Sequence, residues 1–117
     1  MIQIKRIYLK PQTKDGKRFL VDRLWPRGIK KEKAGLSGWI RDIAPSASLR
    51  KWFDHDLKKW KEFQKRYGHE LAANREALKP LLDIAKRGTL TLLFAAKDAE
   101  HNNAVVLQKY LKGRMKG

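Results

Sequence analysis

The stretch TLTLLFAA, Thr89 to Ala96, decides the expected fold. A strand with one face open to water would alternate apolar and polar residues, whereas a continuous apolar run is typical of a central strand covered on both faces in a parallel sheet. The segment KDAEHNNAVVLQKYLKG follows at once. Asp98 is the expected N-cap of a helix there, and the inward residues recur at helical spacing: Ala104, Leu107, Tyr110 and Leu111. The order strand, loop, helix indicates an α/β fold.

Two more strands are expected nearer the N-terminus, at residues 2–9 and 19–25. The second belongs to FLVDRLWPRG, Phe19 to Gly28, whose alternation would place Asp22 and Arg23 on opposite faces in the middle of the strand. Pro26 has no N–H to donate and would end the hydrogen-bond ladder, and Gly28 permits a sharp exit.

Helical spacing of apolar residues dominates from residue 36 to residue 88. A short helix is expected after its N-cap Ser37 and before Pro45, since Leu36, Trp39, Ile40 and Ile43 recur at the spacing of one helical face. A second helix is expected to begin at Ser46 or Ser48. Helical spacing continues through a break near Gly68 or Asn74 and ends at Gly88. The predicted fold over residues 1–117 is therefore a single three-layer α/β domain with a small, largely parallel sheet flanked by helices.

Positive charge is the strongest feature of the composition. The chain has 28 Lys and Arg against 12 Asp and Glu, a formal net charge of +16. Such a charge attracts phosphate-rich partners of every kind, including nucleotides, RNA, DNA and anionic membranes. A solvated, highly charged surface explains the composition equally well, since the basic residues are spread along the whole chain.

Several classes of protein are excluded or disfavoured. The absence of cysteine excludes disulfides, thiolate nucleophiles and Cys-ligated zinc. No run of 18 apolar residues and no signal peptide is found, so we expect a cytoplasmic protein without a membrane partner. Walker, dinucleotide-binding, zinc-protease and Ser/His/Asp signatures are also missing, and no metal or cofactor is expected. A helix-turn-helix over residues 46–82 is disfavoured because its aromatic residues are needed to cover a sheet.

The candidate site lies where the strands at 19–25 and 89–96 end, provided that these strands are parallel neighbours. Ligands of open α/β sheets bind at that edge. Candidate ligand-binding residues are Arg23, Trp25, Arg27, Gly28, Lys97, Asn102 and Asn103. His101 is the candidate general acid or base, with Asp98 or Asp22 holding its tautomer. In the alternative interpretation, Asp22 and Arg23 only fix strand register, and His101 and the asparagines only satisfy the helix start. His55 and His69 are expected to be solvated.

Two functions follow from these residues. The first is binding of a small anionic ligand that carries phosphate or carboxylate between Arg27 and the segment 97–103, with possible hydrolase or transferase chemistry at His101. The second is a basic nucleic-acid-binding protein without catalysis.

Four motifs, VDRLWPRG, LRKWF, LLFAAKD and HNNAVVLQKYL, together resemble the YeaO-like family of small bacterial and archaeal proteins of unknown function. The resemblance extends from Lys5 to Leu111 and implies a single α/β domain but no activity. It points to Asp22, Arg23, Trp25, Pro26, Arg27, Gly28, Trp52, Lys97, Asp98, His101 and Asn102. In the broader family the segment matching residues 100–102 often reads Cys-His-Arg. Here it reads Glu-His-Asn, so thiol chemistry cannot be carried over.

Overall fold

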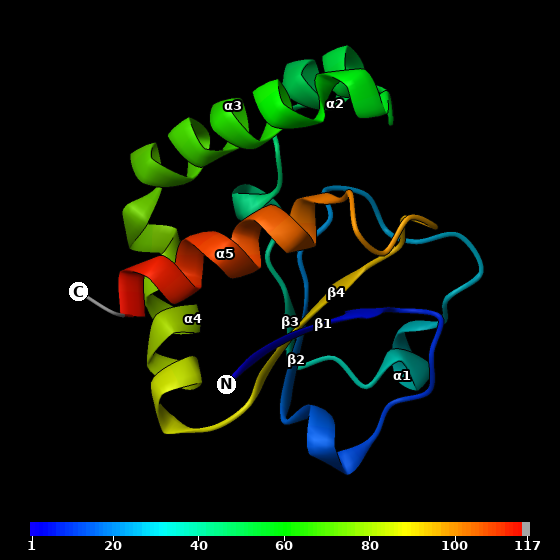
Figure 1. Ribbon diagram of the computed structural model, residues 1–117. Helices are drawn as coiled ribbons and strands as arrows, with labels where there is room; N and C mark the ends of the chain where they lie inside the picture. The colour runs from blue at the N-terminus through cyan, green and yellow to red at the C-terminus, as the bar shows by residue number, and fades with distance from the viewer. Residues whose placement is uncertain (116–117) are drawn as a thin grey trace.

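A computed structural model describes residues 1–115 (Figure 1). The strands are β1 (Ile2–Arg6), β2 (Lys17–Leu20), β3 (Gly38–Trp39) and β4 (Leu90–Phe94). The α-helices are α1 (Lys31–Ala34), α2 (Ala47–Phe53), α3 (Trp60–Ala73), α4 (Arg75–Arg87) and α5 (Asn103–Met115). Three 3-10 turns join them: η1 (Thr13–Asp15), η2 (Arg41–Ile43) and η3 (Leu57–Lys59). None of the helices within residues 1–115 combines the length and apolarity needed to cross a membrane.

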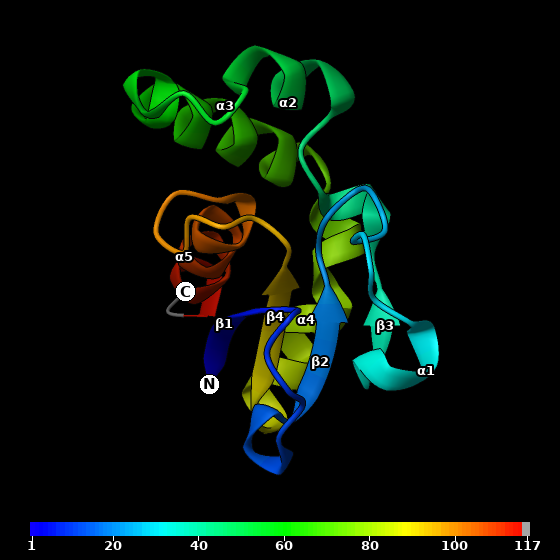
Figure 2. The same ribbon diagram turned by 90° about the vertical axis from the view of Figure 1, so that its right-hand side faces the viewer.

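The four strands form one parallel sheet in the order β1-β4-β2-β3. β4 pairs Leu90 with Ile2 of β1 on one side and with Lys17 of β2 on the other. The expected parallel neighbours, β2 and β4, are therefore confirmed. Their carboxyl ends point toward α2 and α3, which lie beyond that edge of the sheet (Figure 2).

β4 is buried on both faces, as its continuous apolar run predicts. Leu90, Leu92 and Phe94 belong to the main core, which the sheet shares with α2, α3, α4 and α5. Leu93 faces the other way into a smaller core with Ile7 and Leu20. That second face is covered by residues 25–39, in which α1 contributes a single four-residue helix. The predicted α/β architecture is correct, with helices covering one face of the sheet and mostly irregular chain covering the other.

The helix expected between Ser37 and Pro45 is wrong. Gly38 and Trp39 pair with β2 as an edge strand, and η2 follows. The apolar residues that suggested one helical face are divided between the two sides of the sheet: Leu36 and Trp39 pack in the smaller core, Ile40 and Ile43 in the main core. A Cβ at position 38 would lie 2.8 Å from the Phe19 ring, so this close pairing requires glycine.

The strands near the N-terminus are shorter than expected. β1 ends at Arg6 and β2 at Leu20, so Asp22 and Arg23 follow the strand instead of lying within it. The ladder makes one more backbone bond, from Val21 N to Leu93 O, and then changes partner. Ala95 N donates to the Asp22 carboxylate at 2.9 Å. The Asp22 side chain thus ends the ladder, well before Pro26.

Two of the helices near the candidate site, α2 and α5, begin at side-chain caps. Ser46 Oγ accepts from Leu49 N at 3.2 Å and starts α2, as expected for one of the two serines. The break between α3 and α4 lies at Asn74, and Gly68 is inside α3. The N-cap expected at Asp98 is wrong, because Asn102 Oδ1 accepts from Val105 N at 3.1 Å and α5 begins at Asn103.

Candidate functional site

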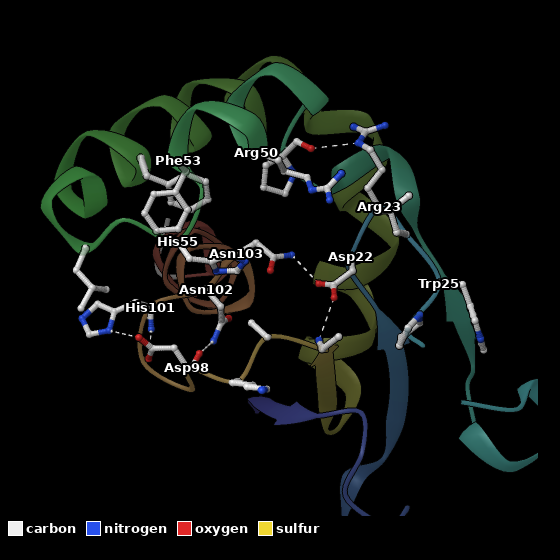
Figure 3. A pocket seen from close by; sticks show the side chains of 18 residues that line it. Asp22, Arg23, Trp25, Arg50, Phe53, His55, Asp98, His101, Asn102 and Asn103 are labelled. Atoms are coloured by element: carbon white, nitrogen blue, oxygen red, sulfur yellow. Dashed lines mark hydrogen bonds and ion pairs between the residues drawn. The ribbon is translucent and has the colours of Figure 1, made fainter. Parts of the chain in front are cut away.

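A cavity of about 660 Å³ lies at the carboxyl edge of the sheet. Its lining comes mainly from three segments that are distant in sequence: residues 22–26 after β2, residues 45–57 in and around α2, and residues 95–103 between β4 and α5 (Figure 3). Phe63 of α3 completes the lining. Two of these segments are the ones that the sequence predicts. The third, α2, was expected only to fill the core.

Asp22 lies between β2 and the start of α5. Its Oδ2 accepts from Ala95 N at 2.9 Å, and its Oδ1 accepts from Asn103 Nδ2 at 3.1 Å. Burial raises the pKa of this carboxyl, against the lowering effects of those two hydrogen bonds and of the Arg50 charge. Asp22 therefore joins the two strands to α5, which is a structural role, and also places a carboxylate in the cavity wall.

The positive groups of the cavity fall into two kinds. Arg23 is held by the backbone, because its Nε donates to Pro45 O at 3.1 Å and its Nη2 to Ala44 O at 3.4 Å. Arg50 and Lys97 are exposed, and within residues 1–115 neither side chain has a carboxylate within 4 Å or a hydrogen bond. Arg50 extends from α2 toward Asp22 (Figure 3). Arg50 and Lys97 are thus the cations available to a ligand.

His101 and Asp98 form a pair at the rim of the cavity. His101 Nδ1 lies 3.0 Å from Asp98 Oδ2, and the imidazole ring packs edge-on against Trp60 at 5.2 Å between centroids. The backbone N–H of Glu100 lowers the pKa of Asp98, and His101 adds to the effect. Of the two carboxylates expected to orient His101, Asp98 does so, while Asp22 is engaged by Ala95 and Asn103.

The two asparagines at the start of α5 both make hydrogen bonds within the protein. Asn102 is buried, donates to Asp98 O at 2.8 Å and caps the helix through Val105 N. Asn103 donates to Val21 O at 3.0 Å as well as to Asp22. The alternative interpretation, in which these side chains only satisfy the helix start, describes the contacts of Asn102, whereas Asn103 joins the start of α5 to the end of β2.

Arg27 and Gly28 do not line the cavity. Arg27 is exposed and its carbonyl accepts from Tyr8 Oη at 2.9 Å, while Gly28 occupies a positive φ of 81° in the turn. Trp25 touches the cavity, but its Nε1 donates to Ile29 O at 2.7 Å and its ring packs on Trp39 in the smaller core. Arg27, which was expected to bind the anion with its guanidinium, therefore lies outside the cavity lining, because β2 ends at Leu20 and the chain turns away from the cavity before residue 27.

Residues of α2 and the turn after it were not predicted for the site. Arg50, Phe53, His55 and Leu57 all line the cavity. Asp54 and His55 have consecutive positive φ values of 45° and 55°, a conformation that costs free energy for residues other than glycine and recurs at functional sites. In the sequence, the charged residues 54–56 (Asp-His-Asp), which interrupt an apolar helical stripe, were the signal that could have indicated this part of the site. His55 is exposed as expected, but it faces a cavity.

Residues 1–115 bring together no group of three or more His, Asp or Glu side chains that could hold a metal ion.

Trp52, which the family resemblance highlights, lies outside the cavity lining. Its ring packs beneath the Arg66 guanidinium at 4.3 Å and the Lys59 ammonium at 5.2 Å.

Comparison with known proteins places this chain among small proteins of similar length. The family described as the inactive DUF488-N3 subclade matches residues 1–117. The protein of Escherichia coli K12 named "Uncharacterized protein YeaO" is 46% identical over 111 residues, which cover 95% of this chain and 96% of that protein. A Mycobacterium tuberculosis H37Rv protein named "Uncharacterized protein Rv3073c" is 36% identical over 113 residues, 97% and 95% of the two chains. The resemblance to YeaO-like proteins is thereby confirmed. No solved structure matches the chain.

Proposed function

Because the chain belongs to the inactive DUF488-N3 subclade, we propose that it binds, without turnover, a small ligand carrying phosphate or carboxylate in the cavity at the carboxyl edge of the sheet. One observation carries the proposal. Arg50 and Lys97 approach the same cavity from α2 and from the loop after β4, and in residues 1–115 neither side chain is engaged by the protein. A guanidinium offers two oxygens a planar fork, and an ammonium adds a point charge.

The size of the cavity and the overall charge agree with such a ligand. A volume of about 660 Å³ lies within the range of small-molecule sites, roughly 300–1,000 Å³. The net charge of +16 raises the local concentration of anions. Hydrolase or transferase chemistry would depend on His101, which Asp98 orients at the rim. The family description favours a site that retains binding but not turnover.

We expect Arg50→Gln to weaken the binding of inorganic phosphate at least about tenfold, because a charge-assisted hydrogen bond contributes about 1.5–3 kcal/mol. Titration followed by amide chemical shifts of Ala95 and Asn103 measures the affinity. Lys51→Gln is the matched control, since it removes one positive charge from the neighbouring position of α2, is exposed and does not line the cavity.

Arg27→Gln separates the structure-based site from the sequence-based one. It should behave like the Lys51 control, because Arg27 lies outside the cavity lining. Equal losses for the Arg50, Lys51 and Arg27 variants would reduce the effect to general electrostatics and contradict the proposed site.

Nucleic-acid binding is the second candidate function. It is favoured because few of the Lys and Arg side chains in the described residues form ion pairs with carboxylates. In the described residues, the Lys and Arg side chains within 4 Å of a carboxylate are Lys5, Arg18, Arg66 and Lys79. We expect labelled RNA or DNA to bind with an affinity that falls steeply with salt, by about 0.7–0.9 log units per log unit of salt for each phosphate neutralised. Titration at two salt concentrations measures this slope. No detectable binding at physiological ionic strength would leave the charge as a solvated surface.

A further inference from the structure

From the contrasting walls of the cavity we infer that its ligand is a nucleoside phosphate: Asp22 faces the ribose hydroxyls, Arg50 and Lys97 face the phosphate, and apolar side chains of the lining, Leu24, Phe53 and Leu57, receive the base. This inference rests on the proposed function and gives the anionic ligand a chemical class. The free nucleotide and the phosphorylated end of an RNA share this chemistry.

Asp22 requires a ligand with more than an anionic group. An ionised carboxylate offers about four acceptor sites, and Ala95 N and Asn103 Nδ2 occupy two of them. No Lys or Arg side chain in residues 1–115 forms an ion pair with Asp22 within 4 Å. A phosphate placed against this carboxylate would be repelled, whereas neighbouring hydroxyl groups would donate to its free acceptor sites. The ligand therefore has a hydroxyl-bearing part that is separate from its anion.

Exposed apolar side chains in the cavity lining indicate a third, apolar part of the ligand. Leu24 is 61% exposed and Leu57 is 58% exposed, two of the largest exposures among the large apolar side chains described. They come from different segments, after β2 and after α2, and both line the cavity. Phe53 also lines the cavity and is stacked on Phe63 at 4.3 Å between centroids. A flat apolar ring would bury these leucines, and inorganic phosphate would leave them exposed.

Isothermal titration of the full chain with four probes at one ionic strength tests the inference: inorganic phosphate, ribose 5-phosphate, AMP and adenosine. We expect AMP to bind at least tenfold more tightly than ribose 5-phosphate, ribose 5-phosphate more tightly than phosphate, and adenosine more weakly than AMP. A 2′-deoxy AMP probe should lose severalfold in affinity, and Asp22→Asn should abolish that difference.

Leu57→Ser tests the base contact without disturbing the core, since Leu57 is exposed. This substitution should weaken the binding of AMP several-fold and leave the affinity for phosphate unchanged. Leu9→Ser, at a 55% exposed leucine outside the cavity lining, should change neither affinity. Equal affinities for AMP, ribose 5-phosphate and phosphate would overturn the nucleotide assignment and leave the anion site standing. Binding of none of the phosphorylated probes would overturn both. A 5′-phosphorylated RNA tetramer that binds more tightly than AMP would identify the RNA end as the source.

Discussion

Asp15→Asn is expected to lower the free energy of unfolding by about 3–5 kcal/mol, the usual cost of removing one partner from a buried ion pair. Asp15 Oδ2 accepts from Arg18 Nη1 at 2.6 Å and from Lys5 Nζ at 2.9 Å, and the Asp15 and Arg18 side chains are 2% and 4% exposed. Gln12 N also donates to this oxygen. Without the carboxylate charge, the Arg18 guanidinium would remain buried beside the sheet with only carbonyl partners. Urea unfolding measures the difference.

Two variants show whether burial causes this effect. Glu62→Gln removes the carboxylate of the exposed pair Glu62–Arg66, whose side chains are about half exposed, and should cost at most about 1 kcal/mol. Replacing Asp15 and Arg18 together with leucine and methionine should recover part of the stability, because the buried guanidinium is removed with its carboxylate. Lys5 loses its carboxylate partner in this variant, but its side chain is 14% exposed and still donates to Lys10 O. Equal losses at Asp15 and Glu62 would contradict this account.

The contribution of Asp15 depends on pH with a definite sign. Burial alone would raise its pKa, but hydrogen bonds from Lys5, Gln12 and Arg18 outweigh burial and hold the pKa below its ordinary value of 3.8. A lowered pKa in the folded state stabilises the fold at all pH values above the ordinary value and loses that contribution as pH falls through the folded-state pKa. The difference between the wild type and Asp15→Asn should therefore be constant near neutral pH and decrease below about pH 4.

Leu93→Ala is expected to lower the free energy of unfolding by about 2–5 kcal/mol, the range for truncating a fully buried leucine. Leu93 is 0% exposed and forms the centre of the smaller core with Ile7 and Leu20, beneath Trp25, Leu36 and Trp39. The covering segment is largely irregular, so a cavity there should also loosen residues 21–26 and weaken ligand binding. Chemical denaturation and amide hydrogen exchange measure the two effects.

Leu24→Ala is the matched control for Leu93, because it deletes the same atoms from a side chain that is 61% exposed. It should change stability by no more than about 0.5 kcal/mol. If Leu93→Ala were equally mild, residues 25–39 would not act as a covering layer, and the three-layer description would fail.

Those features that depend on neighbours in sequence were predictable. The apolar run of β4 can be buried on both faces only between two layers. The order of strand, loop and helix in the sequence is enough to place Lys97, Asp98 and His101 at the carboxyl edge of the sheet. Period and capping are local properties, so α2, α3 and α4 could be located to within a few residues.

Those features that depend on contacts between distant residues were decided by the tertiary structure. Residues 38–39 form a strand and not the expected helix, because they pair with the open edge of β2. Unpaired backbone groups on that edge would cost more free energy than the local helical preference of these residues provides. The strand ends before Asp22, because Ala95 N donates to the Asp22 carboxylate and not to a backbone carbonyl of β2. Phe53 of α2 packs on Phe63 of α3, and with α2 in this position Arg50 lines the cavity, where Arg27 was expected. No short window of sequence contains both members of these pairs, because each contact joins segments that only the folded chain brings together.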